Sequence, residues 1–297
     1  MKPLCTVVIT CYNDGAWLVP AIESVQKSST PCEIIVVDDC STDTPTREIL
    51  KQLATSHKII FLDQNKGVGN ARNKGFEQAS TAYILPLDGD DLLEVDFIEN
   101  AILFLEKNTQ FGVVYGNVQK FGTENKLVEV PEFEGACLLA GNFIANTSLI
   151  KKSDWEKTSG YDTNLPNYED WEMWIKLYEK GVGFKKINQI AFQYRIKATS
   201  KVSKVKDPAH RKKVVQYICD QHPAIYKGNC TAIVPFLHQV ISSNEQDLNT
   251  LKKLDHGDLF SITEKVKSLE IQLKEQKSYY ENSFFWKLKK LVQFYKN

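Results

Sequence analysis

The first third of the chain alternates short apolar runs with segments of helical period. Four runs rich in β-branched residues predict strands, and they begin at Leu4 (LCTVVIT), Glu33 (EIIVVDD), Lys58 (KIIFLD) and Ala82 (AYILPLD). The segments AWLVPAIESVQKS and PTREILKQLA lie between them and follow a helical pattern. Strands separated by helices form parallel sheets with crossover connections. The pattern therefore predicts an α/β fold with a Rossmann-like, mostly parallel sheet flanked by helices.

Each predicted strand leads into a polar loop. The loops are CYND, DDCSTD, NKGVGNARNKG and DGDD, at residues 11–14, 38–43, 65–75 and 88–91. Ligands of parallel sheets bind at the carboxyl ends of the strands. We therefore expect these four loops to share one edge and to form the functional site.

The pattern changes twice later in the chain. Beyond Asn100 the alternation weakens, until YEDWEMWIKLYEKG (residues 168–181) returns to helical period. From about Ser261, apolar and long side chains follow a 4-3-4-3-4 spacing, typical of an amphipathic or coiled-coil helix: Ile262, Val266, Leu269, Leu273, Gln276 and Tyr280. We expect a catalytic-type domain over 1–205, a helical extension over 206–260 and an amphipathic C-terminal helix over 261–297, which is a candidate for pairing copies of the chain.

Composition and charge exclude several classes of protein. The chain has 297 residues, of which 42% are hydrophobic, enough to bury a substantial core. Lysine plus arginine and aspartate plus glutamate number 37 each, so no global basic field favours nucleic acid. Any function that depends on charge must therefore be local.

The cysteines and the apolar runs predict a cytoplasmic protein. The seven cysteines are odd in number and include no Cys-x-x-Cys pair, which fits neither a disulfide framework nor a zinc knuckle. No apolar run approaches the roughly 20 residues of a membrane helix. The first residues reach Asn13 and Asp14 without a small-residue cleavage site, so we do not expect secretion.

The last stretch, FFWKLKKLVQFYKN (residues 284–297), combines aromatic residues with four lysines and contains no acid. This composition favours contact with an anionic membrane surface or with a partner groove. We expect peripheral membrane contact through this stretch.

The glycine-rich loop resembles two nucleotide-binding motifs and matches neither. Gly67 and Gly69 begin a Gly-x-Gly pattern, but Arg72 occupies the third glycine position and the loop follows the third strand. The chain has no Gly-Lys dipeptide, which excludes a Walker loop. A helix that starts near Asn70 remains, with Lys66 and Arg72 available for phosphate. The alternative is an ordinary helix start.

Two acidic stretches are candidates for donor and metal binding. Capping of the next helix explains Asp43 in DDCSTD but not Asp38 and Asp39 at the strand tip, where carboxylates can accept hydrogen bonds from a ribose or a base. In DGDD, the carboxylates offer oxygen ligands for a divalent cation, and Gly89 lets the chain curl so that they converge. An acidic surface turn is the alternative.

The stretch YEDWEMW suggests a site that could bind a sugar ring. The helix macrodipole favours one acid at a helix start but does not require both Glu169 and Asp170. Trp171 and Trp174 beside carboxylates suit a sugar ring, because its C–H faces pack on indoles and its hydroxyls bond to acids. For Trp174 a place in the core is the stronger interpretation.

Taken together, these segments resemble the family 2 glycosyltransferases of the GT-A fold. The resemblance runs from about Thr6 to Ser200 through VITCYND, IIVVDDCSTD, NKGVGNARNKG, LPLDGDD, SGYDTNLPNYEDWEMWIKL and YRIKATS, in that order. It implies inverting transfer of a sugar from a nucleoside diphosphate donor with Mg²⁺ or Mn²⁺, and a GT-A domain over 1–205.

The resemblance also implies roles for individual residues. Asp88 and Asp90 would hold the metal, Asp170 would be the general base, and Glu169 and Trp171 would contact the acceptor. Donor contacts are expected from residues in the loops after the predicted strands: Tyr12, Asn13, Asp38, Asp39, Lys66, Gly69, Arg72 and Asp88. Displacement at the anomeric carbon needs a base on the acceptor face and charge relief for the diphosphate on the other, which one acid cannot supply.

The chain departs from the family pattern at two positions. Cys40 stands where the family usually has glycine, and Lys197 stands where many relatives carry a metal-binding histidine. An ammonium cannot ligate a cation, so Lys197 weakens the case for a metal, and it could contact phosphate instead. The Gln-x-x-Arg-Trp signature of processive relatives is absent from the sequence, which favours addition of one sugar at a time.

We therefore expect an inverting transferase that moves one sugar, with a UDP-sugar as the expected donor, to a glycan or lipid-linked acceptor in surface polysaccharide synthesis. The alternative is a non-catalytic subunit that binds nucleotide sugars within a glycan-assembly complex. Both hypotheses predict donor binding, and the presence of Asp170 together with Asp88 and Asp90 favours the enzyme.

Overall fold

The computed structural model describes residues 2–197 and 208–253 and divides the chain into two compact units, Met1–Ser200 and Lys201–Asn297. In the described part of the second unit, α9 (Pro208–Gln221) is followed by the long helix α10 (Pro223–Lys253). The domain bounds expected from the sequence stay predictions. The helix predicted over 261–297 lies outside the described residues. Among the helices that the structure describes, none combines the length and apolar character needed to cross a bilayer.

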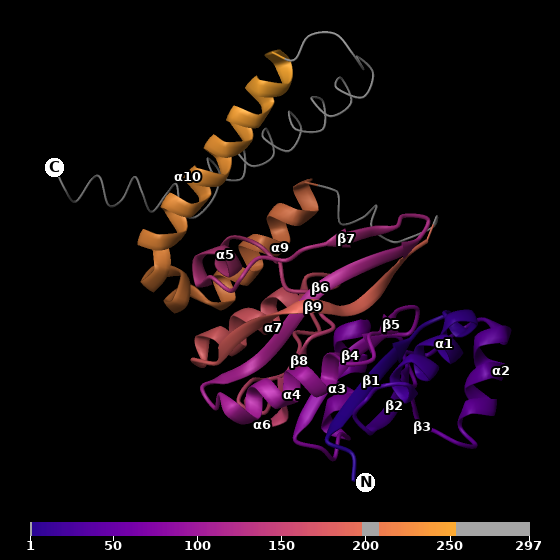
Figure 1. The fold of residues 1–297 in the computed structure, drawn as a ribbon. Helices are drawn as coiled ribbons and strands as arrows, with labels where there is room; N and C mark the ends of the chain where they lie inside the picture. Colours follow the sequence, from indigo (N-terminus) through magenta and orange to yellow (C-terminus); the bar gives the residue numbers. More distant parts are fainter. Residues whose placement is uncertain (1, 198–207, 254–297) are drawn as a thin grey trace. The chain divides into compact units, whose positions relative to one another are not determined.

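The four strands predicted in the first third of the chain are confirmed. They are β1 (Cys5–Cys11), β2 (Cys32–Asp38), β3 (Lys58–Phe61) and β4 (Tyr83–Asp88), and they pair in parallel in the order β3-β2-β1-β4 (Figure 1). The connections are helical: α1 (Gly15–Gln26), α2 (Thr44–Leu53) and α3 (Val68–Glu77). The helix predicted near Asn70 begins two residues earlier, at Val68.

Side chains of β1 alternate between two layers, as the period of a strand requires. Val7 and Ile9 belong to the core shared with α1 and with α4 (Phe97–Lys107), whereas Val8 points to the opposite face. There α3 packs so closely that a Cβ on Gly75 would lie 2.2 Å from Val8 Cγ1. The sheet is therefore covered on both faces.

The rest of the first unit extends this sheet with mixed pairing. The further strands are β5 (Leu92–Leu93), β6 (Phe111–Gly122), β7 (Lys126–Val128), β8 (Leu149–Lys151) and β9 (Gly183–Ile196). β8 lies antiparallel to β4 and β6, while the long strand β9 runs parallel to β6 with register shifts. Those irregularities explain why the apolar alternation weakens beyond Asn100. Helices α5 (Gly135–Ala140), α6 (Lys152–Trp155) and α7 (Glu169–Glu179) complete the unit.

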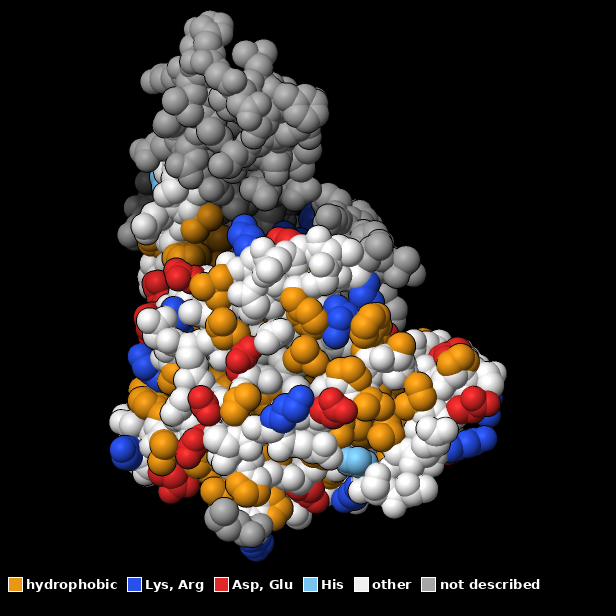
Figure 2. Space-filling view, turned by 45° about the vertical axis from the view of Figure 1, so that its right-hand side comes forward, with side chains coloured by type: hydrophobic (Ala, Val, Ile, Leu, Met, Phe, Trp, Pro, Cys, Tyr) orange, Lys and Arg blue, Asp and Glu red, His pale blue; other side chains and the backbone are white. Residues whose placement is uncertain are grey.

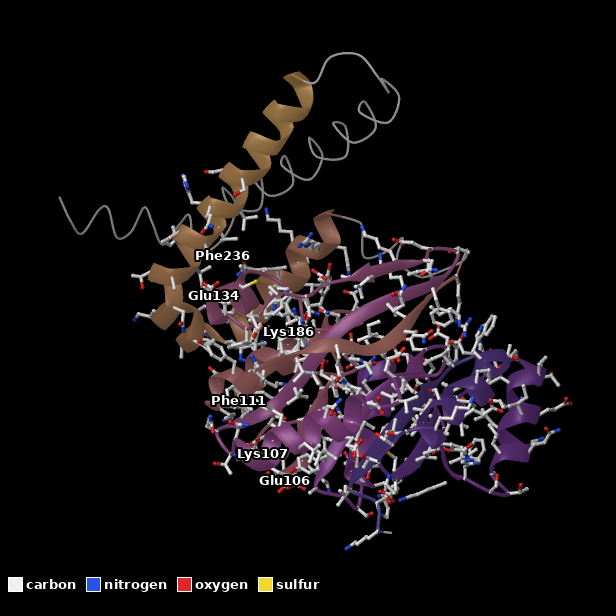
Figure 3. The ribbon with its side chains drawn as sticks, in the orientation of Figure 1. Glu106, Lys107, Phe111, Glu134, Lys186 and Phe236 are labelled. Atoms are coloured by element: carbon white, nitrogen blue, oxygen red, sulfur yellow. The ribbon has the colours of Figure 1, made fainter. Side chains whose placement is uncertain are left out.

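The two ends of the parallel strands differ in character. At the amino end of β4, Tyr83 donates a hydrogen bond to Glu106, which lies with Lys107 and Phe111 where α4 ends and β6 begins (Figure 3). At the carboxyl ends lie the four polar loops that the sequence analysis singled out. The candidate functional site lies at that second edge.

Candidate active site

The site forms at the point where the strand order changes direction. β2 lies on one side of β1 and β4 on the other, and ligands of parallel sheets bind at such a point. Thr10 at the end of β1 donates to Asp88 at the end of β4 (3.3 Å), and the Gly89 amide donates to the Thr10 carbonyl (2.9 Å). A Cβ on Gly89 would lie 2.8 Å from that carbonyl oxygen. Gly89 is thus required for close approach to β1.

Asp38 and Asp39 organise the loops beside them. Asp38 Oδ1 accepts from the amide (3.0 Å) and hydroxyl (2.5 Å) of Ser41. The two oxygens of Asp39 accept from the amides of Lys66 (3.0 Å) and Gly67 (2.9 Å). Both side chains are buried. Asp38 orders the loop after β2, and Asp39 joins that loop to the loop after β3. Their contact with a base or ribose stays a prediction.

Asn13 joins the loop after β1 to the loop after β2. Its Oδ1 accepts from the amides of Thr42 (2.8 Å) and Asp43 (3.2 Å), and its backbone adopts a left-handed conformation with φ 58°. Asparagine tolerates this conformation better than most residues. Tyr12, directly before Asn13, is half-buried at the same place. The expected donor contacts of both residues stay predictions.

The backbone of Cys40 explains the first departure from the family pattern. Cys40 has φ 63°, in the left-handed region that glycine adopts without a steric penalty. The left-handed backbone therefore explains why the family usually has glycine at this position. Cysteine keeps the same loop shape at a cost in backbone strain.

Helix α3 begins at a turn that needs glycine. Gly67 has φ 89°, in the region that favours glycine. Lys66 precedes this turn and is exposed, and its contact with a phosphate stays a prediction. Gly69 is buried in ordinary contact distance of Glu169 on α7, and its donor contact stays a prediction.

Arg72 is buried between two carboxylates. Nη2 lies 2.8 Å from Asp88 Oδ1, Nη1 lies 2.5 Å from Glu169 Oε1, and the guanidinium packs over the Tyr161 ring. Burial opposes its charge, but Asp88 and Glu169 outweigh burial and raise the pKa of Arg72, so it stays cationic. Sequence analysis expected this side chain to be available for phosphate. In the structure it instead connects the end of β4 to α7.

Asp170 has the properties of a general base. It is the second residue of α7; its Oδ1 accepts from the Trp171 amide (2.8 Å) and its Oδ2 from Asn142 Nδ2 (2.9 Å). Burial and the neighbouring charge of Glu169 raise the pKa of Asp170 to about 7, against the opposing effects of Arg72 and of the two hydrogen bonds. A carboxylate with a pKa near neutrality can take a proton at physiological pH.

The neighbours of Asp170 are less accessible than the sequence analysis expected. Glu169 is buried and paired with Arg72, and the Trp171 indole is 2% exposed and donates to the Leu138 carbonyl (2.7 Å). A buried indole offers no face to a sugar ring, so this arrangement does not favour the acceptor contacts expected of these residues. The core interpretation of Trp174 is confirmed by its complete burial.

The acidic turn after β4 is held by cations from β9. Asp91 is buried and accepts from the Arg195 amide (2.8 Å), and Arg195 Nε donates to the Asp90 carbonyl (2.8 Å). Lys197 Nζ lies 2.7 Å from Asp90 Oδ2 and 2.5 Å from Asp14 Oδ1. Burial raises the pKa of Asp90, and the charges of Asp88 and Asp14 add to this, while Lys197 opposes it.

This arrangement does not fit a divalent cation. The Asp90 carboxylate is already bound by the ammonium of Lys197, and Oδ1 of Asp88 is bound by the guanidinium of Arg72. Within residues 2–197 and 208–253, no group of three or more His, Cys, Asp or Glu side chains could hold a metal ion. A divalent ion also requires oxygen ligands that are not neutralised by an ammonium. The charged groups at this turn are therefore paired with one another.

Three residues at this edge were not assigned a role from the sequence. Asp14 and Arg195 lie in segments that were recognised as polar loops or family motifs, but nothing in their spacing shows that they meet Lys197 or Asp90. Asn142 lies in the region where the periodic pattern weakens, and its contact with Asp170 spans 28 residues. Such long-range contacts leave no local signal in the sequence.

Comparisons with known proteins agree with the geometry. The family model described as glycosyl transferase family 2 matches residues 6–170. A Bacillus subtilis protein named for teichuronic acid biosynthesis, the glycosyltransferase TuaG, is 32% identical over 206 residues, covering 66% of this chain and 80% of that protein. The chondroitin synthase of Escherichia coli is 29% identical over 196 residues. That match covers 64% of this chain and only 28% of the synthase.

Solved structures share the fold at low sequence identity. Residues 1–349 of Staphylococcus aureus TarS, in complex with UDP-GlcNAc, align with a TM-score of 0.61 and 19% identity, covering 73% of this chain and 65% of that one. The mannosyltransferase PcManGT of Pyrobaculum calidifontis, in complex with GDP-Man and Mn²⁺, aligns with a TM-score of 0.57 and 14% identity, covering 94% and 87%. The curled mixed sheet flanked by helices is therefore a GT-A fold.

Proposed function

Because the chain belongs to glycosyl transferase family 2, we propose that it transfers one sugar at a time from a nucleoside diphosphate donor to a glycan or lipid-linked acceptor, with inversion. The relatives named for teichuronic acid biosynthesis and chondroitin synthesis support a role in surface polysaccharide synthesis. The neighbour in complex with UDP-GlcNAc supports a UDP-sugar, and the neighbour with GDP-Man makes GDP the second nucleotide to test.

One observation carries this proposal: Arg72 bridges the donor-side turn to the start of α7. Asp88 ends β4, Glu169 begins α7, and both bind the same buried guanidinium. Asp170 follows Glu169 directly, so the expected base lies on the same edge as the loops after β1, β2 and β4. A donor at the switch point and an acceptor at α7 would then meet.

The reaction follows from these positions. Asp170, when ionised, accepts the proton of the acceptor hydroxyl, and that oxygen attacks the anomeric carbon of the donor sugar. The bond from the anomeric carbon to the diphosphate breaks, and the nucleoside diphosphate leaves with the electron pair. One base acting on the face opposite the leaving group gives inversion. Asn142 and the Trp171 amide hold Asp170 in place.

The expected Mg²⁺ or Mn²⁺ stays a prediction for this chain. The Mn²⁺ complex of PcManGT supports it. The ion pair between Lys197 and Asp90 argues against it, because the carboxylate expected to bind the metal already contacts an ammonium. The two alternatives make opposite predictions for nucleotide binding in EDTA.

The test of the proposed function separates chemistry from binding. A thermal-shift screen of UDP, GDP, CDP and dTDP with their sugars identifies the donor, because a bound ligand raises the apparent stability by mass action. In transfer or donor hydrolysis assays, Asp170→Asn should lower turnover at least about a hundredfold, within the range of general-base catalysis. Nucleotide affinity should be nearly unchanged.

Glu169→Gln is the matched rival variant. If Asp170→Asn keeps near-normal turnover while Glu169→Gln loses it, the base is Glu169. If the wild-type chain binds a nucleotide sugar but shows neither transfer nor hydrolysis, the alternative of a non-catalytic binding subunit is favoured.

A further inference from the structure

Several contacts fix the end of β9 beside the acidic turn at Asp90 and Asp91. β9 pairs with β5 through Phe192 and Gln193, which brings its last residues beside Asp90 and Asp91. Two residues before Lys197, the Arg195 amide is bound by Asp91, and the Arg195 guanidinium lies over the rings of Trp17 (4.0 Å) and Phe121 (4.2 Å). The backbone that carries Lys197 is therefore held from several sides.

The Lys197 ammonium lies between two carboxylates from different loops. It contacts Asp90 after β4 and Asp14 after β1, and all three side chains are partly exposed, at 24%, 21% and 34% respectively. The three groups are thus shielded enough to interact strongly and open enough to meet a ligand. They lie at the switch point between β1 and β4, where a donor is expected.

Asp14 binds Lys197 and does not cap its own helix. It is the N-cap residue of α1, a position where aspartate normally accepts a hydrogen bond from the helix backbone. Its side chain makes no such capping bond and binds Lys197 instead. The carboxylate at the start of α1 therefore pairs with the Lys197 ammonium.

Two arginines near the acidic turn are held by other partners. Arg72 is 3% exposed and bridges Asp88 and Glu169, and the Arg195 guanidinium packs between aromatic rings. Lys197 differs from these two arginines because its charge lies at the end of a flexible side chain. Its ammonium can therefore change hydrogen-bond partners. A diphosphate entering an edge rich in carboxylates needs such a cation.

We infer that the Lys197 ammonium, held by Asp14 and Asp90, is the cation that receives the donor diphosphate, so that nucleotide binding needs no divalent metal. The inference rests on the proposed function. A divalent ion on Asp90 would be repelled by the ammonium beside it, and an ammonium has no lone pair with which to bind the ion. Lysine binds phosphate as a point charge and therefore supplies the charge relief itself.

Isothermal titration with UDP and GDP tests the inference. The wild-type chain should bind the preferred nucleotide with affinities that agree within about threefold in EDTA and in Mn²⁺. Lys197→Met should weaken binding in EDTA by about tenfold or more, the size of one hydrogen bond to a charged group. Lys197→Arg, which keeps the charge, should retain most of the affinity.

Lys185→Met is the matched control. Lys185 lies on the same strand and pairs with Glu132 at the surface (3.0 Å), so its loss should leave nucleotide affinity unchanged. Electron paramagnetic resonance of Mn²⁺ gives a readout independent of activity. Wild-type protein should leave the free Mn²⁺ signal intact, whereas Lys197→Met uncovers Asp14 and Asp90 and should reduce that signal.

Two results would overturn the inference. If wild-type binding rises more than about tenfold when Mn²⁺ replaces EDTA, the metal carries the diphosphate while the proposed function stands. If Lys197→Met binds the nucleotide as the wild type does in EDTA, the ammonium does not contact it. Absence of nucleotide binding in every condition would reject the proposed function and the inference together.

Discussion

At the scale of single residues, two adjacent acids in one short helix have different environments. Glu169 is buried and neutralised by Arg72, whereas Asp170 is half-buried and held by the neutral donors of Asn142 and the Trp171 amide. Burial and the charge of Glu169 raise the pKa of Asp170 to about 7. The environment, and not the residue type, separates a structural acid from a candidate base.

The raised pKa predicts how turnover depends on pH. The base must be ionised, so kcat at saturating donor should rise with pH and level off above an inflection near the pKa of about 7. Asn142→Ala removes a hydrogen bond that favours the ionised form, so it should move the inflection to higher pH. A pH–rate profile of both proteins measures this shift.

Asn125→Ala is a suitable control, because Asn125 is exposed in the β6–β7 turn and its side chain bonds to Gln119 and not to Asp170. Its profile should match that of the wild type. A flat profile between about pH 6 and 8, or an unshifted inflection in Asn142→Ala, would contradict the assignment of Asp170 as the base.

At the scale of elements, Arg72 connects three parts of the chain that are distant in sequence. It lies on α3 and binds the last residue of β4 and the first residue of α7. Gly75 lets α3 pack closely on β1, because a Cβ there would lie 2.2 Å from Val8 Cγ1. The ion pairs thus set the position of the base relative to the donor-side turn.

We predict that Arg72→Met destabilises the first unit strongly. The change leaves Glu169 buried without its partner and removes one partner of Asp88, and breaking a buried pair in this way costs about 3–5 kcal/mol. Urea unfolding followed by tryptophan fluorescence measures the loss, because four of the five tryptophans, Trp17, Trp155, Trp171 and Trp174, lie in that unit.

The control is Lys74→Met on the same helix. Lys74 and Glu77 form an exposed pair, with both side chains 48% exposed, so its loss should change the free energy of unfolding by less than about 1 kcal/mol. Similar unfolding midpoints for Arg72→Met and Lys74→Met would show that the buried bridge does not hold the elements together.

At the scale of the whole molecule, charge is balanced overall and concentrated locally. On the face shown in Figure 2, basic and acidic side chains are interspersed among apolar and neutral ones. This agrees with the zero formal net charge of the chain. The exception that the sequence shows is the last stretch, residues 284–297, which lies outside the described residues.

For that stretch we predict binding to anionic vesicles. Lys287, Lys289, Lys290 and Lys296 should each add about 1 kcal/mol near an anionic surface. Sedimentation with phosphatidylserine-containing vesicles should therefore bring down the full chain but not a variant with all four lysines changed to glutamine. Neutral phosphatidylcholine vesicles serve as the control. Equal partitioning of the two proteins would leave pairing of copies through the 261–297 helix as the simpler use.

Local patterns in the sequence were sufficient to predict the parallel part of the fold and the polar segments at the carboxyl ends of its strands. Strands β1 to β4 alternate with helices and end in polar loops, and a parallel sheet brings those ends to one edge. The helix at α7 and the core position of Trp174 follow from helical period and apolar character. These features depend on residues close together in the chain, which is why composition and spacing reveal them.

Tertiary structure alone decided what the charged residues at that edge do. Arg72 was expected at a phosphate and lies buried between Asp88 and Glu169; Lys197 meets Asp14 across 183 residues. An ion pair depends on distance in space and on burial, and neither is encoded by the residues next to it in sequence. Packing of the elements therefore decides whether an acid pairs with a cation, accepts hydrogen bonds from a loop or has a raised pKa.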